Sequence, residues 1–168
     1  MAVSVRLDEV KRSTNRRTDL GELAGRAIGT ALNQHISDAL PGLFEATPED
    51  VRLAARRLSR SDGISQLTRG FFANVIQATL SYWLERTLAD QAVSGGRFSS
   101  TGSRNAFDAE LRAYSLEATR IIKEFSSGWY TKTLHQHGSI SGNDAAVFAA
   151  VCLRKVTSEL QVKRVSDA

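Results

Sequence analysis

The sequence has few of the residues that stabilise small secreted proteins or interrupt helices. It contains one cysteine and two prolines in 168 residues. A single cysteine excludes an internal disulfide framework, and long stretches without proline permit long helices. The longest apolar run, residues 145–153, is far too short to span a bilayer. We therefore expect a cytoplasmic protein with no membrane segment.

Charge is missing from the middle of the chain, over residues 71–84 (FFANVIQATLSYWL). Drawn as a helix, this stretch is apolar around most of its circumference and leaves only a narrow polar strip of Asn74, Gln77 and Ser81. Such a helix must be enclosed by protein or by lipid, and the stretch is too short and too polar for a membrane span. We predict that residues 64–92 form the central, buried helix of the fold.

Helical periodicity predicts further helices over residues 19–40, 47–60, 104–127 and 143–162. Asp19 with Glu22, the Thr47-Pro48-Glu49-Asp50 segment, and Asn143 provide the expected start signals. Residues 126–128 (Ser-Ser-Gly) are expected to kink or break the chain before 129–137. The helix 143–162 is apolar on both sides, so we expect it inside. The prediction is a single-domain, all-α bundle of about five helices over residues 19–168, preceded by a basic arm, residues 1–18.

The strongest electrostatic feature is a run of four arginines in the predicted helix 47–60. Seventeen of the 22 cationic residues in the chain are arginine. Within this run no acid is interleaved, and two interpretations are open. The arginines form a solvated face that Glu49, Asp50 and Asp62 partly neutralise, or they contact nucleic-acid phosphates or an acidic partner. The predicted phosphate contacts are Arg52, Arg56, Arg57 and Arg60, with Lys11, Arg12, Arg16, Arg17, Arg97 and Arg104 as outlying contacts.

Two other features bear on partners. Gly21, Gly25 and Gly29 are spaced four residues apart in the predicted helix 19–40, and each glycine costs roughly 1 kcal/mol there relative to alanine. Close packing by another helix of the domain or by a second subunit would return that cost, and Leu53 is a further candidate interface residue. Residues 93–105 are rich in Gly, Ser and Thr. A flexible linker explains them better than a phosphate loop, because they lack the GK[ST] ending of a P-loop.

Candidate catalytic groups are sparse. His135 and His137 form the only histidine pair, with Asp144 as a conceivable third metal ligand, but residues two apart do not share a helix face. Cys152 lies among apolar residues, where a thiol has a raised pKa and is inert. Trp83 and Trp129 are expected in the core. No cofactor or bound metal is predicted.

The features together predict a non-enzymatic helical subunit or adaptor of a bacterial nucleoprotein assembly, contacting the nucleic-acid backbone through its arginines. Small helical subunits of bacterial ribonucleoprotein effectors, such as CRISPR interference complexes, are similar in size, helicity and basic surface, although the similarity covers no motif. Two alternatives are open. One is a protein–protein interaction module, an oligomer or antitoxin-like partner, without nucleic acid; the other is a small metal-dependent enzyme using His135 and His137.

Overall fold

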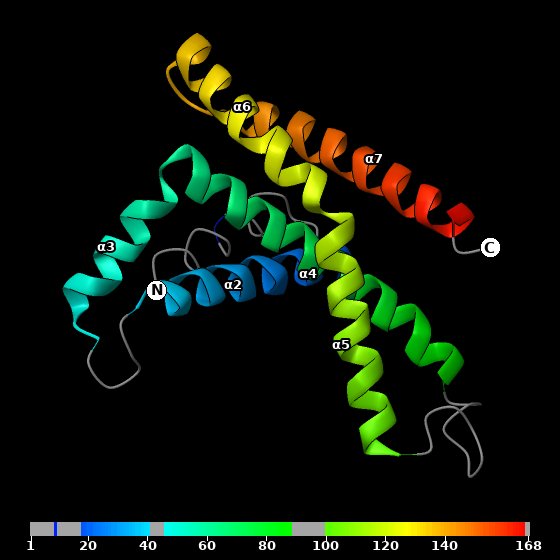
Figure 1. The fold of residues 1–168 in the computed structure, drawn as a ribbon. Coiled ribbons are helices and arrows are strands. Elements are labelled where there is room, and N and C mark those ends of the chain that lie inside the picture. Colours follow the sequence, from blue (N-terminus) through cyan, green and yellow to red (C-terminus); the bar gives the residue numbers. More distant parts are fainter. Residues whose placement is uncertain (1–8, 10–17, 41–45, 89–99, 167–168) are drawn as a thin grey trace.

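The computed structural model describes residues 9, 18–40, 46–88 and 100–166, and every regular element in this part of the chain is helical. The elements are α2 (Asp19–Ala39), α3 (Pro48–Leu58), α4 (Ser61–Leu88), α5 (Thr101–Ala118), α6 (Arg120–His137) and α7 (Gly142–Ser166). The predicted all-α fold is confirmed (Figure 1). Most of the predicted basic arm, residues 1–8 and 10–17, lies outside the described residues.

The helix starts follow capping chemistry, with two corrections to the expected caps. Thr47 is the N-cap of α3 as predicted, and it forms a capping box with Asp50, whose carboxylate accepts from the Thr47 backbone N–H at 2.9 Å. In α2 the N-cap is Thr18, whose hydroxyl accepts from the Gly21 N–H at 3.1 Å, so Asp19 is the first helical residue instead. In α7 the capping hydroxyl belongs to Ser141 and not to Asn143. A cap must precede the helix with extended backbone, and in α2 Thr18 meets that condition.

The helix α4 is the centre of the fold over its first half. It packs against α2, α3, α5 and α6, and Phe72, Ala73 and Ile76 are buried. Phe72 and Ile76 join side chains of three other helices in the main core cluster, which contains Ala118 of α5, Ile122 of α6, and Phe148, Cys152 and Val156 of α7. The uncharged composition of α4 thus correctly predicted a core helix here.

The last part of α4 is not enclosed by any helix of the described residues. Tyr82 and Trp83 are 54% and 62% exposed. The expectation that Trp83 lies in the core is therefore wrong, whereas Trp129 does pack in the core, where its ring stacks on Phe148 with centroids 4.1 Å apart. The neighbouring helices cover α4 only where they cross it, and composition alone does not say where a crossing ends.

The helix α7 is also less buried than its composition suggested. It lies along α6 at the surface of the bundle (Figure 1). One face, with Phe148, Cys152 and Val156, is buried, while Val147 and Leu153 on the other side are exposed. The predicted interior position of this helix is wrong, because α7 has neighbours on one side only among the described helices.

The chain breaks between α5 and α6 at Thr119, and not at Ser126–Gly128 as expected. Thr119 is fully buried, and its hydroxyl donates to the Ser115 carbonyl at 2.9 Å. The carbonyl of Leu116, at the break, accepts two hydrogen bonds from the Arg69 guanidinium of α4, at 2.9 and 3.3 Å. Residues 126–128 lie inside α6, and residues 101–105 belong to α5 instead of the predicted linker.

Candidate nucleic-acid interface

The corner between α3 and α4 makes α3 project from one end of the bundle (Figure 1). Only two residues, Ser59 and Arg60, separate the two helices. Gly63 is buried in this corner, and a Cβ built on it would lie 2.2 Å from the Arg57 carbonyl oxygen. The Tyr130 hydroxyl of α6 donates to the Ser59 carbonyl at 3.2 Å and ties the corner to the bundle. The position of α3 is therefore fixed by close backbone contact that only glycine permits.

Four arginines of this corner, Arg52, Arg56, Arg57 and Arg60, are all exposed and are called the Arg surface below. Arg52 pairs with Glu49 at 3.5 Å, with both side chains more than half exposed. Such exposed pairs contribute little free energy. Within the described part of the chain no carboxylate forms an ion pair with the other three. The Arg surface thus keeps most of its positive charge.

The acids expected to neutralise the Arg surface are mostly engaged elsewhere. The Asp50 carboxylate accepts hydrogen bonds from the hydroxyl and the backbone of Thr47, and these bonds lower its pKa. Asp62 accepts from the Gln66 side-chain amide at 2.7 Å. Of the three acids, Glu49 alone contacts a guanidinium, that of Arg52.

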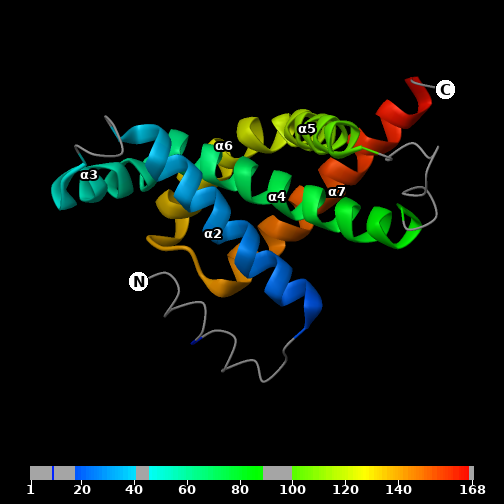
Figure 2. The ribbon, with the colours of Figure 1, turned by 90° about the horizontal axis from the view of Figure 1, so that it is seen from below.

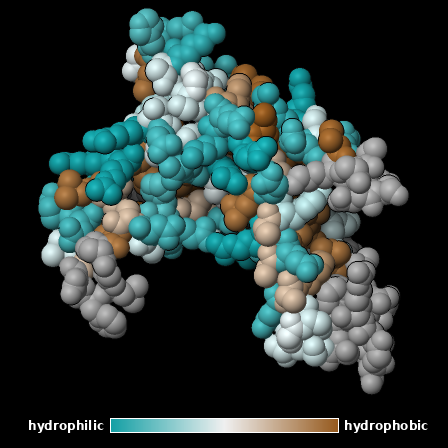
Figure 3. Space-filling view, viewed as in Figure 1, coloured by the Kyte–Doolittle hydropathy of each residue, from teal (hydrophilic) through white to brown (hydrophobic). Residues whose placement is uncertain are grey.

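The Arg surface combines charge with one apolar side chain. Leu53 is 47% exposed on the same helix. Hydrophilic side chains project over α3 in Figure 3, with some hydrophobic atoms between them. Because a guanidinium presents a planar fork of donors, each arginine is able to bind two oxygens of a phosphate or carboxylate.

The other predicted contacts are not gathered with the Arg surface. Arg104 is exposed in the first turn of α5, at the end of that helix distant from α3 (Figures 1 and 2). Lys11, Arg12, Arg16, Arg17 and Arg97 lie outside the described residues.

Two of the predicted interface glycines make no close helix contact within the described chain. A Cβ at Gly29 would meet nothing within 4 Å, and one at Gly21 would meet only the Thr18 hydroxyl. The close approach of α2 and α4 occurs instead at Gly70, where a Cβ would lie 3.6 Å from the Ala31 Cβ. Packing among the described helices does not explain Gly21 and Gly29, so a contact with a second subunit stays a prediction for this stripe, including Gly25.

The histidine pair is not assembled into a metal site. His137 lies 3.5 Å from the Asp144 carboxylate, which also accepts hydrogen bonds from the hydroxyl and backbone of Ser141. These bonds lower the pKa of Asp144. His135 is exposed on α6, and in the described ranges no three His, Cys, Asp or Glu side chains are placed to hold a metal ion. Burial raises the pKa of the Cys152 thiol to about 12, so it is a poor nucleophile.

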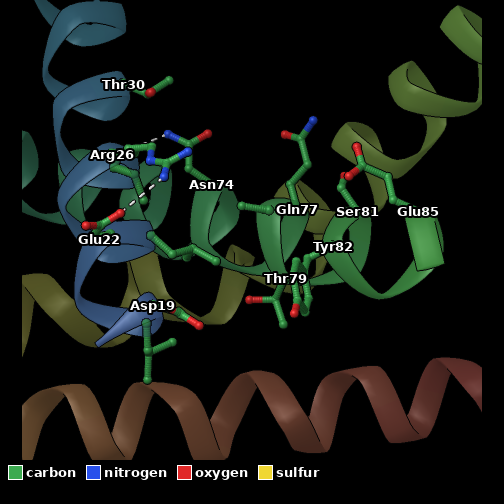
Figure 4. Close-up of a pocket in the computed structure, with 14 residues that line it drawn as sticks. Asp19, Glu22, Arg26, Thr30, Asn74, Gln77, Thr79, Ser81, Tyr82 and Glu85 are labelled. Atoms are coloured by element: carbon green, nitrogen blue, oxygen red, sulfur yellow. Dashed lines mark hydrogen bonds and ion pairs between the residues drawn. The ribbon is translucent and has the colours of Figure 1, made fainter. Parts of the chain in front are cut away.

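The structure adds one feature that the sequence patterns did not predict, a groove between α2 and α4 of about 730 Å³. Asp19, Glu22 and Glu85 line it, together with Arg26, which pairs with Glu22 at 3.4 Å (Figure 4). The polar strip Asn74, Gln77 and Ser81 faces this groove, and the Asn74 amide donates to the Ala27 carbonyl. In the sequence, this polar strip within an otherwise apolar helix is the one feature that indicates the groove.

Comparison with known protein families, curated proteins and solved structures finds no match for this chain. Among the described residues, no helix has the length and apolar character that crossing a membrane requires.

Proposed function

We propose that this protein is a non-enzymatic helical subunit or adaptor of a bacterial, cytoplasmic nucleoprotein assembly, and that the Arg surface rests on the nucleic-acid backbone. The observation that carries the proposal is the exposure of four guanidiniums, three on the projecting helix α3 and one in the turn that follows it, of which three have no ion-pair partner in the described chain. Contacts of this kind neutralise phosphates and position the protein without reading sequence.

The electrostatic setting supports this proposal. Each phosphate contact made by an arginine releases condensed counterions, so binding depends steeply on salt. Three of the cations lie on α3 and Arg60 lies in the turn after it, and the Gly63 corner fixes the position of both, so little ordering of the backbone is required on binding. The Asp50 carboxylate accepts hydrogen bonds from the hydroxyl and the backbone N–H of Thr47 at the helix cap, which lower its pKa, and it makes no ion pair with the arginines in the described residues.

The test is a salt titration of binding to generic single-stranded RNA and duplex DNA. The wild-type protein should lose affinity steeply as salt rises. Arg52→Ala combined with Arg56→Ala should weaken binding and reduce the slope of log affinity against log salt by about two, roughly one for each phosphate contact.

The matched control is Arg112→Ala combined with Arg154→Ala, two exposed arginines of α5 and α7. This pair removes the same charge from other helices and should leave most of the affinity and the slope intact. If both double variants change the slope equally, binding follows net charge and the assignment to the Arg surface fails.

A protein–protein interaction module without nucleic acid is the second candidate. It is favoured by the exposure of Tyr82 and Trp83 at the end of α4, because large exposed apolar side chains that cluster mark interaction sites. Wild-type protein that binds neither RNA nor DNA at low salt, yet elutes above its monomer mass, would select this candidate.

A further inference from the structure

The α2–α4 groove and the Arg surface lie at opposite ends of the α2–α4 pair. The helices α2 and α4 cross at an angle, and the start of α2 and the last part of α4 diverge from that crossing (Figures 2 and 4). The groove lies between these diverging parts, where Asp19 and Glu85 both line it. The helix α3 lies at the other end of the α2–α4 pair (Figure 2).

The two features are opposite in charge. Three carboxylates, of Asp19, Glu22 and Glu85, line the groove against the single guanidinium of Arg26. The Arg surface carries four guanidiniums, and only Arg52 has an acidic partner in the described residues. Opposite charges of this kind steer encounter and fix the orientation of two partners.

The two features also agree in length and in apolar character. The groove follows α2 from Asp19 to Thr30 and α4 from Asn74 to Glu85, about 18 Å of helix on each side. The helix α3 has 11 residues and is therefore about 16 Å long. Exposed Leu20 and Tyr82 lie at the groove, and exposed Val51 and Leu53 lie on α3. A helix laid in such a groove would cover apolar surface on both partners.

We propose that the occupant of the α2–α4 groove is helix α3 of a second copy of this chain, held by its Arg surface against Asp19, Glu22 and Glu85. Because the two contact surfaces differ, the association is either reciprocal between two copies or head-to-tail along several. The protein would then be a self-associating subunit, a property beyond nucleic-acid binding.

Self-association and phosphate binding would compete for the same arginines. If the proposed function holds, adding a generic oligonucleotide should lower the mass of the self-associated protein. This consequence alone rests on the proposed function; the docking of α3 into the groove does not.

A charge-swap experiment tests the inference. The groove variant carries Glu22→Arg and Glu85→Arg, and the α3 variant carries Arg56→Glu and Arg57→Glu. The wild-type protein should elute above its monomer mass in low salt by light scattering and return to monomer in high salt. Each variant alone should be a monomer. An equimolar mixture of the two variants should associate again, because each groove then meets an α3 of opposite charge.

The control is Glu110→Arg with Glu124→Arg, exposed residues of α5 and α6 that do not line the groove; it should keep the wild-type mass. Circular dichroism establishes that every variant is folded. A wild-type protein that is monomeric at all concentrations in low salt would overturn the inference, and so would a mixture that stays monomeric. A mass loss in the α3 variant with unchanged affinity for RNA and DNA would support self-association while rejecting the proposed function.

Discussion

The two halves of α4 carry the same number of charged residues, two each, but have different surroundings. In the first half, Gly63, Ser65 and Phe72 are buried beneath neighbouring helices. Towards the other end, Tyr82 and Trp83 are more than half exposed, although this part of the helix is no more polar. The stretch from Phe71 to Leu84 carries no charge at all.

The difference in exposure between the two halves shows that a helix lacks charged residues for two distinct reasons. Where α2, α3, α5 and α6 cross α4, apolar side chains stabilise the fold of this chain. Beyond those crossings, the same side chains leave apolar surface in contact with water, and burial of such surface would stabilise a contact with another molecule. The first half should therefore dominate the free energy of unfolding, and the second half should dominate association.

The largest effect is expected at the corner that fixes the covered end of α4. Gly63→Ala would place a Cβ 2.2 Å from the Arg57 carbonyl oxygen. Backbone on both sides must move, so we expect a loss of more than about 4 kcal/mol in the free energy of unfolding, measured by urea denaturation.

Gly128→Ala is the matched control for that substitution. A Cβ at Gly128, inside α6, would meet nothing within 4 Å. This change should stabilise the protein by up to about 1 kcal/mol. Equal effects of the two substitutions would show that the corner is not closely packed.

The comparison itself is tested by one substitution in each half of α4. Phe72 is 3% exposed in the core cluster, so Phe72→Ala should lower the free energy of unfolding by about 3–5 kcal/mol. Trp83→Ala should change it by less than about 0.5 kcal/mol, since the side chain is mostly in water. A large destabilisation by Trp83→Ala, measured by the same denaturation, would mean that both halves of α4 are enclosed within one chain.

A smaller effect is expected at the helix cap of α3, which packs on the covered part of α4. Thr47→Ala removes the capping hydroxyl and should cost about 1 kcal/mol at neutral pH. The hydrogen bonds from Thr47 hold the pKa of Asp50 below its ordinary value of 3.8. Because the pKa of Asp50 is lower in the folded state than in the unfolded state, ionised Asp50 stabilises the fold at pH values above its unfolded-state pKa. This contribution is lost as the pH falls through the folded-state pKa.

The stability difference between wild type and Thr47→Ala should therefore shrink as pH falls below about 4, which thermal unfolding at several pH values would measure. A difference that stays constant down to the lowest pH would contradict the assigned cause of the pKa shift.

Local sequence patterns are sufficient for some elements and not for others. The Thr47-Pro48-Glu49-Asp50 segment and the uncharged stretch of α4 predict a helix start and a core helix, because each depends on neighbours in sequence. The break at Thr119 is not predicted, since it involves hydrogen bonds from Arg69, 47 residues from Leu116 in sequence. The exposed side of α7 is not predicted for a related reason: an apolar helix shows what it is able to bury, and not how many neighbours reach it.

The candidate site divides in the same way. The spacing of Arg52, Arg56 and Arg60 is enough to predict an exposed basic face from the sequence alone. It does not reveal that Asp50 and Asp62 are bonded elsewhere, because that depends on side-chain geometry. The groove requires two helices that lie far apart in sequence, so local patterns indicate only its polar strip.

The most direct test of the central claim is the salt dependence of RNA and DNA binding, measured in parallel for wild type and for the Arg52→Ala, Arg56→Ala double variant. The account predicts that the double variant binds more weakly at low salt and responds less steeply to added salt. Superimposable titrations of the two proteins would contradict it, since the Arg surface would then make no contact with phosphate.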